Sequence, residues 1–368
     1  MHKKRERLAS LDAMRGYTIA AMILVNFPGT WDHVYGPLLH SDWNGLTFTD
    51  LIAPFFLFIV GVSVVLAYSS RLEQGHSRSK LYLKVFWRSF KIFAVGILLN
   101  ILALFPEFNL ADMRWTGTLQ RIAVVFLACG VLYFWSGWKG RAWTAGLILA
   151  GYWLAMSFIP TPGYGKAMLE PGINLAAWVD SHLLPGRMWQ GTWDPESILT
   201  TFPAIASGIT GMLAGHLLIS SRSREAKALL LLVAGYLSSV AGYAWGLVFP
   251  VNENLWTSSF VLVTSGFAAM TLGVAYYLVD IRGYRFATGP GVVFGSNAIT
   301  AYVLGDILAL LFYLIPFPLY SLNELFVSSL VSIGFAPELA SMLYGLFFVG
   351  MVFIPVYLLY RKRIFLKL

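Results

Sequence analysis

The residues of this chain best suited to chemistry lie in and around one short polar segment, His40-Ser41-Asp42-Trp43-Asn44-Gly45. The imidazole of His40 titrates near neutral pH, so it is suited to taking up and delivering a proton. Asp50 follows the segment and has a carboxylate that could orient the imidazole. Asn26 precedes it and has an amide that could bond a reacting carbonyl group. These residue types predict a general base, its orienting partner and an electrophile stabiliser.

Simpler roles exist for the same residues. Asp50 and Asn26 stand at the ends of apolar stretches, where polar side chains commonly cap helices. His33 lies in the same loop as His40 and competes with it for the role of base. Spacing alone does not separate the two histidines.

The composition defines the kind of protein that must position these residues. The chain has 368 residues, of which 58% are hydrophobic and only 12% are charged. A soluble domain has roughly 25% charged residues. Apolar runs of about 20 residues recur along the sequence, and in lipid such runs must be helical because backbone groups have to bond internally. The sequence therefore predicts an all-α, polytopic transmembrane helix bundle.

We expect ten transmembrane helices in a single domain over residues 1–368. They are predicted at Ser10–Phe27, Thr49–Ser69, Val85–Phe105, Thr118–Trp135, Ala142–Ile159, Ile198–Ile219, Ala228–Phe249, Trp256–Val279, Val292–Ile315 and Glu338–Tyr360. The apolar stretch Phe317–Phe335 is interpreted as a re-entrant or interfacial element, because an eleventh span would put the basic C-terminal tail outside.

The basic residues predict the orientation. With both termini in the cytoplasm, all but four of the 26 lysines and arginines lie on the cytoplasmic side. The four exceptions are Arg114, Arg121, Lys166 and Arg187. Cytoplasmic loops of membrane proteins carry such an excess, which favours a multi-pass protein with both termini inside. The long outer loop 160–197, rich in Gly, Pro and Trp, is then expected to cap an extracytoplasmic cleft.

Several charged residues are expected at the cytoplasmic ends of helices. Asp12 and Arg15 lie in the first turns of the first helix, and Arg88 and Lys91 lie near the start of the third. A helix N-terminus with basic side chains is a natural phosphate site. The simpler alternatives are an Asp12–Arg15 ion pair and basic side chains that reach lipid headgroups.

A second polar group is expected on the outer side. Gln120 and Arg121 open the fourth helix, and Asn252, Asn254 and Trp256 precede the eighth. Amides and an indole could bind a sugar by hydrogen bonds and stacking, although a polar turn with an interfacial tryptophan is the simpler alternative. Arg121 lies inside the apolar boundary, so it should pair or face a cavity. The six histidines and the single cysteine have no metal-ligand spacing, so no metal is expected.

An ordered set of motifs resembles the heparan-α-glucosaminide N-acetyltransferase family and its bacterial relatives. The motifs, all read directly from the sequence, are Leu8-Ala9-Ser10-Leu11-Asp12-Ala13-Met14-Arg15-Gly16, Val25-Asn26, His40-Ser41-Asp42-Trp43-Asn44-Gly45-Leu46-Thr47, Gly117-Thr118-Leu119-Gln120-Arg121, Asp194-Pro195-Glu196-Ser197-Ile198-Leu199-Thr200-Thr201, Val251-Asn252-Glu253-Asn254-Leu255-Trp256-Thr257 and Ser296-Asn297-Ala298-Ile299. They cover nearly the whole chain. Ser197 and Glu253 stand where the family has a glycine and a basic residue.

The resemblance implies a transmembrane acetyltransferase that moves the acetyl group of cytosolic acetyl-CoA to an amino sugar across the membrane. His40 falls on the family's catalytic histidine and Asn26 on its nearby asparagine, with Asp50 as the orienting carboxylate. Direct transfer with His40 as base is favoured over an acetyl-histidine intermediate. The resemblance also suggests a homodimer.

The candidate ligand-binding residues form two sets. The acetyl-CoA set is Asp12, Arg15, Arg88, Lys91, Ser296 and Asn297. The acceptor set is Trp43, Asn44, Gln120, Arg121, Glu196, Asn252, Asn254 and Trp256. A transporter that moves an amino sugar or N-acetylglucosamine without chemistry is the alternative, because polar groups such as Asn297 within a span also fit that class.

Overall fold

A computed structural model describes residues 8–104, 108–314 and 321–366. All regular elements of these residues are helical, as predicted. The chain divides into two compact units. The central unit comprises Asp42–Leu46 and Leu57–Tyr277. The terminal unit comprises Leu8–Ser41, Thr47–Phe56 and Leu278–Leu368.

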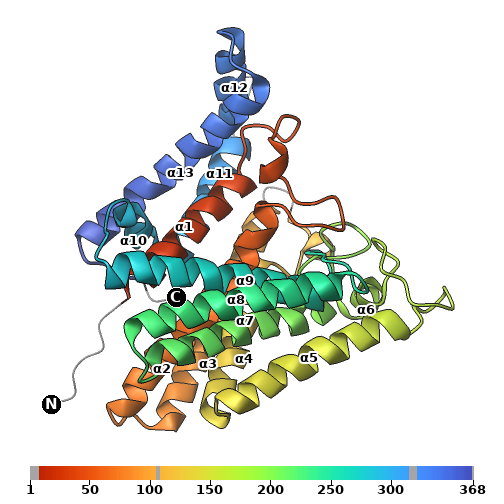
Figure 1. The fold of residues 1–368 in the computed structure, drawn as a ribbon. Helices are drawn as coiled ribbons and strands as arrows, with labels where there is room; N and C mark the ends of the chain where they lie inside the picture. Colours follow the sequence, from red (N-terminus) through yellow and green to blue (C-terminus); the bar gives the residue numbers. More distant parts are fainter. Residues whose placement is uncertain (1–7, 105–107, 315–320, 367–368) are drawn as a thin grey trace. The chain divides into compact units, whose positions relative to one another are not determined.

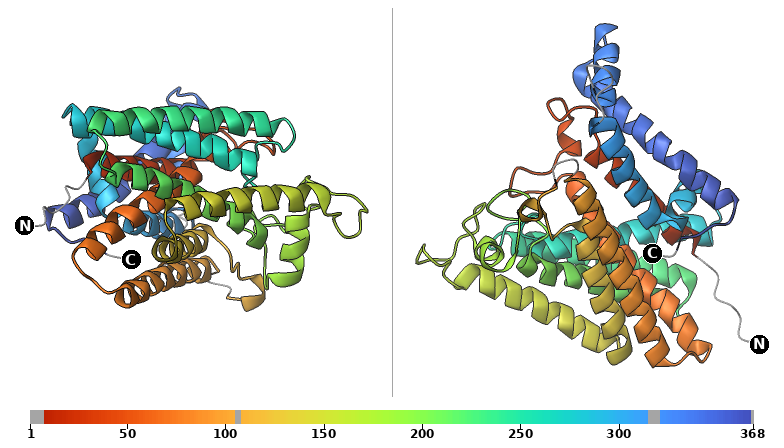
Figure 2. Two further views of the ribbon diagram at one scale, coloured as in Figure 1. Left: turned by 60° about the horizontal axis from the view of Figure 1, so that its bottom comes forward. Right: turned by 180° about the vertical axis from the view of Figure 1, so that it is seen from behind.

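The central unit contains most of α2 and the helices up to α9. Their bounds are α2 Ile52–Glu73, α3 Arg78–Leu102, α4 Thr118–Trp135, α5 Trp138–Phe158, α6 Leu175–Leu183, α7 Ile198–Ile219, α8 Arg224–Gly246 and α9 Ser258–Ala275. Helices α8 and α9 lie side by side (Figure 1), as do α3 and α4 (Figure 2). A π-helical segment, Tyr276–Ile281, continues α9.

The terminal unit contains the first helix and the last four. Their bounds are α1 Ala9–Asn26, α10 Thr288–Ser296, α11 Ala298–Leu314, α12 Leu322–Ser332 and α13 Pro337–Arg361. Short 3₁₀ turns at Gly36–Leu38 and Thr49–Leu51 shape the loop that carries His40. Helix α1 packs against α10, α11 and α13.

Each of the ten stretches predicted to span a membrane contains a helix. Seven helices in the described residues are long and apolar enough to cross one, and the pair α10–α11 makes an eighth if it crosses as one span. Helices α1 and α5 do not meet the same measure of length and hydropathy. The chain is thus an all-helical, multi-pass membrane protein. The predicted start of the third helix was wrong by seven residues, because α3 begins at Arg78 and includes the basic residues that suggested a loop.

The prediction of one continuous ninth helix was wrong. Helices α10 and α11 meet at an angle of 83°. The break falls at Asn297, whose backbone leaves the helical region at φ −132° and ψ 44°. The Asn297 amide donates to the carbonyl of Ile364 at 3.1 Å and accepts the N–H of Leu366 at 2.9 Å. These bonds to another segment stabilise the bend.

The stretch expected to be re-entrant or interfacial contains α12, which has 11 residues. At 1.5 Å per residue it is about 16 Å long, roughly half of what a bilayer core requires. Residues 317–320 of the stretch lie outside the described part of the chain. The helix begins with a capping box made by Ser321 and Glu324.

The loop 160–197, predicted to lie on the outer side, contains the helix α6. Asn174 caps α6 by accepting the N–H of Ala177 at 2.9 Å. Tyr152 and Met156 of α5 form an apolar cluster with Leu175 and Ala176 of α6. This packing fixes the loop against α5, within the central unit.

Glycines bring α2 and α7 into close contact inside the central unit. A Cβ atom on Gly61 would clash with the carbonyl oxygen of Gly208, and one on Gly211 would clash with that of Phe58. Small residues at helix contacts let the backbones approach, which strengthens packing where no hydrophobic force acts between helices in lipid. The backbones of α2 and α7 are therefore in direct van der Waals contact at these glycines.

Substituting Gly211 tests this contact. Gly211→Ala should destabilise the protein by about 1–3 kcal/mol, because the added methyl group forces α2 and α7 apart. The measurement is thermal unfolding in detergent. Gly146→Ala on α5 is the matched control, since open space surrounds that position. Equal melting temperatures for the two variants would contradict the close packing.

Candidate active site

The candidate site in the terminal unit is built on His40 and Asp50. His40 Nδ1 lies 2.8 Å from Oδ1 of Asp50. The Asp50 side chain is fully buried, whereas 52% of the His40 side chain is exposed. A half-exposed ring held by a buried carboxylate can exchange protons with a ligand.

The loop around His40 folds around the Asp50 carboxylate. Its Oδ2 accepts the backbone N–H groups of Thr47 at 2.8 Å and Ser41 at 3.3 Å. The Thr47 hydroxyl donates to the carbonyl of Leu39 at 2.7 Å. Residues on both sides of His40 are thereby fixed, which keeps the imidazole in place.

The same contacts assign roles to the two ring nitrogens. An ionised carboxylate only accepts hydrogen bonds, so Nδ1 carries the proton that it donates to Asp50. The lone pair of a neutral ring is then on Nε2, which is the arrangement of a general base. Asp50 also stabilises the imidazolium that forms when Nε2 takes a proton.

The His33 ring is held less firmly than the His40 ring. Its Nδ1 lies 3.7 Å from Oε1 of Glu338, and about half of each side chain is exposed. An exposed pair at that distance contributes little. The geometry therefore favours His40 as the base.

Asn26 is the last residue of α1 and is partly exposed. The helix end is completed by the N–H of Phe27, which bonds the carbonyl of Ile23. Within the described residues, the Asn26 side chain makes no hydrogen bond. The alternative role of Asn26 as a side-chain cap is therefore not observed.

Four residues of the expected acetyl-CoA set lie together in the terminal unit. Arg15 contacts Oδ1 of Asp12 and the carbonyl of Gly295, both at 3.3 Å. Gly295 immediately precedes Ser296 and Asn297. The Asn297 amide is already occupied by the 364–366 segment, and the Ser296 hydroxyl donates to the carbonyl of Val293. Among these side chains, the Arg15 guanidinium is therefore the group best placed to bind a phosphate.

The start of α1 is capped by a residue from far along the chain. The carboxylate of Asp280 accepts the N–H groups of Ala9 at 3.0 Å and Ser10 at 3.2 Å. The buried Ser10 hydroxyl has no hydrogen-bond partner among the described residues. The negative charge at this end suits the helix dipole, and it comes from a distant residue.

Arg88 and Lys91 belong to the central unit, where both are exposed on α3. The Arg88 guanidinium lies 4.9 Å from the ring centre of Phe126 on α4. Basic side chains on an exposed helix face suit anionic phosphates of either a ligand or lipid.

The acceptor set lies in the central unit, and two of its members, Asn44 and Asn252, are in direct contact. Asn252 donates through Nδ2 to Oδ1 of Asn44 at 3.1 Å. Gly45 donates its N–H to the carbonyl of Val251 at 2.8 Å, and its φ of 129° favours glycine. Trp43 stacks edge-on against Trp193 of the outer loop, with ring centres 5.2 Å apart. The amides and indoles expected to hold a sugar therefore gather at one place.

Arg121 and Trp256 form a second contact of this set. The Arg121 guanidinium lies 4.7 Å from the Trp256 ring centre and also donates to the Pro195 carbonyl. The Trp256 indole donates to Ser207 at 3.0 Å, and its ring is 2% exposed. Both side chains are buried, so their first role is to position the segments that they join.

The remaining three members differ in accessibility. Gln120 is buried beside Gly96 and Gly117, and its Nε2 has no hydrogen-bond partner among the described residues. Asn254 and Glu196 are partly exposed. Glu196 and Asn254 can therefore meet a ligand as the structure stands, whereas Gln120 cannot.

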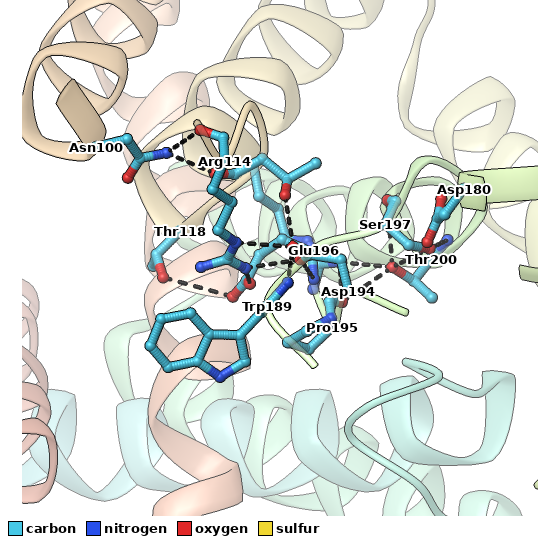
Figure 3. A network of polar contacts seen from close by, with 12 residues as sticks. Asn100, Arg114, Thr118, Asp180, Trp189, Asp194, Pro195, Glu196, Ser197 and Thr200 are labelled. Atoms are coloured by element: carbon cyan, nitrogen blue, oxygen red, sulfur yellow. Dashed lines mark hydrogen bonds and ion pairs between the residues drawn. The ribbon is translucent and has the colours of Figure 1, made fainter. Parts of the chain in front are cut away.

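A charge network that the sequence did not predict surrounds Glu196 (Figure 3). Arg114 donates to Asp194 through Nε at 2.7 Å and Nη2 at 2.6 Å, and also contacts Glu196. Asp194 further accepts the Thr116 hydroxyl at 2.7 Å and the N–H of Trp189 at 3.1 Å. The sequence contains Arg114 and the motif that begins with Asp194, but no spacing links the two segments.

The network shifts the titration of its members. Burial raises the pKa of Asp194, but the hydrogen bonds and charge of Arg114 outweigh it and hold that pKa below the ordinary 3.8. Burial lowers the pKa of Arg114, and its contacts with Asp194 and Glu196 more than compensate, so that pKa is raised. Both groups are charged near neutral pH.

These features define a membrane protein with an imidazole–carboxylate pair and a polar, aromatic site for a ligand. The family profile described as "Heparan-alpha-glucosaminide N-acetyltransferase, catalytic" matches residues 7–243, about two thirds of the chain. The chain belongs to this family, in agreement with the motifs in the sequence.

Two relatives carry the name heparan-alpha-glucosaminide N-acetyltransferase. The Mus musculus protein is 30% identical over 82% of this chain and 54% of its own length. The Homo sapiens protein is 31% identical over 81% of this chain and 52% of its own length. The chain thus spans about half the length of the curated relatives that it matches.

Removing Arg114 tests the charge network. Arg114→Met should destabilise the protein by roughly 3 kcal/mol, because it leaves the buried Asp194 carboxylate without its cation. The loss should be full above pH 3.8 and shrink as acid protonates Asp194, since a carboxyl with a lowered pKa stabilises the fold only when ionised.

The measurement is thermal unfolding at a series of pH values from neutral to below 3.8. Arg187→Met is the control, because the Arg187 side chain is exposed. The hydrogen bond to the Met113 carbonyl comes from the backbone N–H of Arg187 and survives the substitution. A loss of the same size in both variants would contradict the role of the network.

Proposed function

We propose that the chain is an acetyltransferase that moves the acetyl group of acetyl-CoA to the amine of an amino sugar, with His40 as general base. The observation that carries this proposal is the 2.8 Å contact between the half-exposed His40 ring and the buried Asp50. Membership of a family named for N-acetyl transfer supports the reaction type. We treat residues 1–368 as one functional domain made of the two units.

The proposed transfer is direct. The neutral amine nitrogen attacks the thioester carbonyl carbon while Nε2 of His40 takes one proton from that nitrogen. The carbon–sulfur bond breaks, and the proton passes from His40 to the leaving thiolate. Asp50 stabilises the imidazolium between these two steps. This route needs one positioned base and no second nucleophile.

Asn26 is the proposed electrophile stabiliser. Its partly exposed amide makes no hydrogen bond with the described part of the chain, so it can donate to the thioester oxygen as negative charge develops there. Asn26 and His40 both belong to the terminal unit.

The acetyl-CoA phosphates are proposed to bind basic side chains at the helix ends expected to face the cytoplasm. Arg15 is the central residue, because its guanidinium lies between Asp12 and the backbone that leads to Ser296 and Asn297. Arg88 and Lys91 supply further positive charge from α3. No metal takes part in the proposed reaction.

The acceptor is proposed to bind the polar and aromatic side chains of the central unit. Glu196 and Asn254 are the accessible groups, Trp43, Asn44 and Asn252 form the amide and indole contact, and the buried Gln120, Arg121 and Trp256 support them. A carboxylate such as Glu196 suits an ammonium, and an indole suits a sugar face. Only two residues separate His40 from Trp43 in the sequence.

The setting of the reaction follows from the distribution of charge. We propose that both termini are cytoplasmic and that the loop 160–197 lies on the outer side of a bacterial inner membrane. Acetyl-CoA would then enter from the cytoplasm and the amino sugar from outside. A homodimer is proposed from the resemblance to the family.

One observation favours a second candidate, a sugar transporter without chemistry. The break between α10 and α11 resembles the discontinuous helices that form binding sites in transporters. The two functions differ in one property, because only the transferase consumes acetyl-CoA.

The decisive assay is acetyl-CoA consumption by purified protein with glucosamine as acceptor. His40→Ala should reduce turnover by about 10²–10⁴-fold, the usual contribution of a general base. His33→Ala is the matched control, since it removes the other imidazole of the same loop, and it should retain wild-type turnover. Full activity in a folded His40→Ala protein would rule out the proposed base. Transport of the sugar without acetyl-CoA consumption would favour the second candidate.

Substituting Asp50 separates orientation from proton transfer. Asp50→Asn should lower kcat/KM by about tenfold or more, because the amide cannot stabilise the imidazolium. The KM for acetyl-CoA should stay unchanged, since Asp50 binds no substrate. The measurement is steady-state kinetics with each substrate varied. Unchanged kcat/KM would contradict the orienting role.

A further inference from the structure

Asp180 is a buried carboxyl group that the proposed chemistry does not use. It lies in α6, its side chain is sealed from solvent, and its Oδ1 accepts the backbone N–H of Ile198 at 3.1 Å. Its Oδ2 is also buried and has no hydrogen-bond partner among the described residues. An unsatisfied buried polar atom costs about 1–3 kcal/mol. A second role is therefore needed to explain this residue.

The contact places Asp180 at the start of α7. Ile198 is the first residue of that helix, and Ser197 before it is the N-cap, accepting the N–H of Thr200 at 3.2 Å. Figure 3 shows Asp180 beside Ser197 at one end of the segment 194–198. Asp194, held by Arg114, fixes the other end. Glu196, the proposed acceptor carboxylate, lies between these two fixed points.

Three charged or titratable groups face Asp180 from the elements around it. They are Asp194 before α7, Arg121 of α4 and Tyr152 of α5. Burial raises the pKa of the Asp180 carboxyl to about 7, and the negative charge of Asp194 acts in the same direction. The Ile198 N–H, the Ser197 hydroxyl and the charge of Arg121 oppose the rise. The carboxyl is thus partly protonated near neutral pH.

Protonation resolves the unsatisfied oxygen. A neutral Asp180 carries an O–H that can donate to the Ser197 hydroxyl oxygen beside it, while Oδ1 keeps the Ile198 N–H. Ionisation releases that proton to water and leaves a negative charge next to Asp194, with the Ile198 N–H and the Ser197 hydroxyl as its donors. Such a charge favours local opening, which lets water reach it.

We propose that Asp180 is a proton-dependent positioning residue that, in its neutral form, locks the segment 194–198 and thereby the acceptor carboxylate Glu196. Ionisation loosens the segment and weakens acceptor binding. The inference rests on the proposed function for its effect on catalysis, whereas its effect on the fold does not.

Asp180→Asn provides the kinetic test. The amide is neutral at every pH and keeps an oxygen for Ile198, so it reproduces the neutral acid. With glucosamine as acceptor, the ratio of wild-type to Asp180→Asn KM should be near one at pH 6 and rise by roughly threefold or more by pH 8, as Asp180 ionises. Titration of His40 and of the amine is common to both proteins and cancels in the ratio.

A ratio that does not change with pH would overturn the proposal. Asp112→Asn is the matched control, because Asp112 is an exposed carboxylate of the same unit, outside the network. Its ratio to the wild type should stay flat. Changes confined to kcat would also count against a role in positioning Glu196.

Thermal unfolding tests Asp180 independently of activity. A carboxyl whose pKa is raised by folding stabilises the fold below its ordinary pKa of 3.8, and that contribution is lost as pH rises towards about 7. The melting temperature of Asp180→Asn relative to wild type should therefore increase between pH 4 and pH 7 and level off above. A melting-temperature difference that stays constant from pH 4 to pH 7 would mean that Asp180 only caps a helix, and it would overturn the proposal.

Two further outcomes remain interpretable. If the protein transfers no acetyl group at all, the proposed function fails, and the unfolding comparison still decides the role of Asp180. If Asp180→Asn does not fold, hydrogen exchange of wild-type residues 194–200 takes its place. Protection that falls above pH 7, after correction for intrinsic exchange, supports the proposal, and constant protection contradicts it.

Discussion

A carboxylate sealed from water must be surrounded by hydrogen-bond donors, and this requirement organises the loops at both candidate sites. Asp50 gathers His40 and two backbone N–H groups, and so determines where the imidazole points. Asp194 gathers Arg114, Thr116 and backbone donors, and so determines the path of the outer loop. The chemistry and the fold of these loops therefore depend on the same atoms.

The helices followed from the sequence because their cause is local. Long apolar runs in lipid have to satisfy their own backbone groups, so composition alone predicts helix and approximate bounds. The break at Asn297 has a different cause, since its amide bonds a segment almost seventy residues away. No local pattern contains that information. The start of α3 was misplaced for a related reason, because charged residues were taken as the end of an element when they lie on its exposed face.

The candidate sites divide in the same way. The motif around His40 predicts the base and its partner, because residues ten apart in one loop meet in space. Asn252 lies about two hundred residues after Trp43 and Asn44. They were assigned to one set because of the resemblance to a family, and not because of their spacing. Arg114 and Asp180 were missed, since their roles depend on burial and on partners that distant segments provide. Cytoplasmic location of the termini and the membrane of residence stay predictions.

The fit between α1 and α10 has a mechanical consequence. Side chains on Gly16 and Gly295 would clash with the backbone of the opposite helix, so the two backbones touch along their length. Surfaces in such contact resist sliding, because any axial shift drives carbonyl oxygens into one another. Arg15, one residue before Gly16, is then coupled rigidly to the bend at Asn297. Because Asn297 is also bonded to the segment 364–366, α1, α10 and the bend are joined into one rigid element.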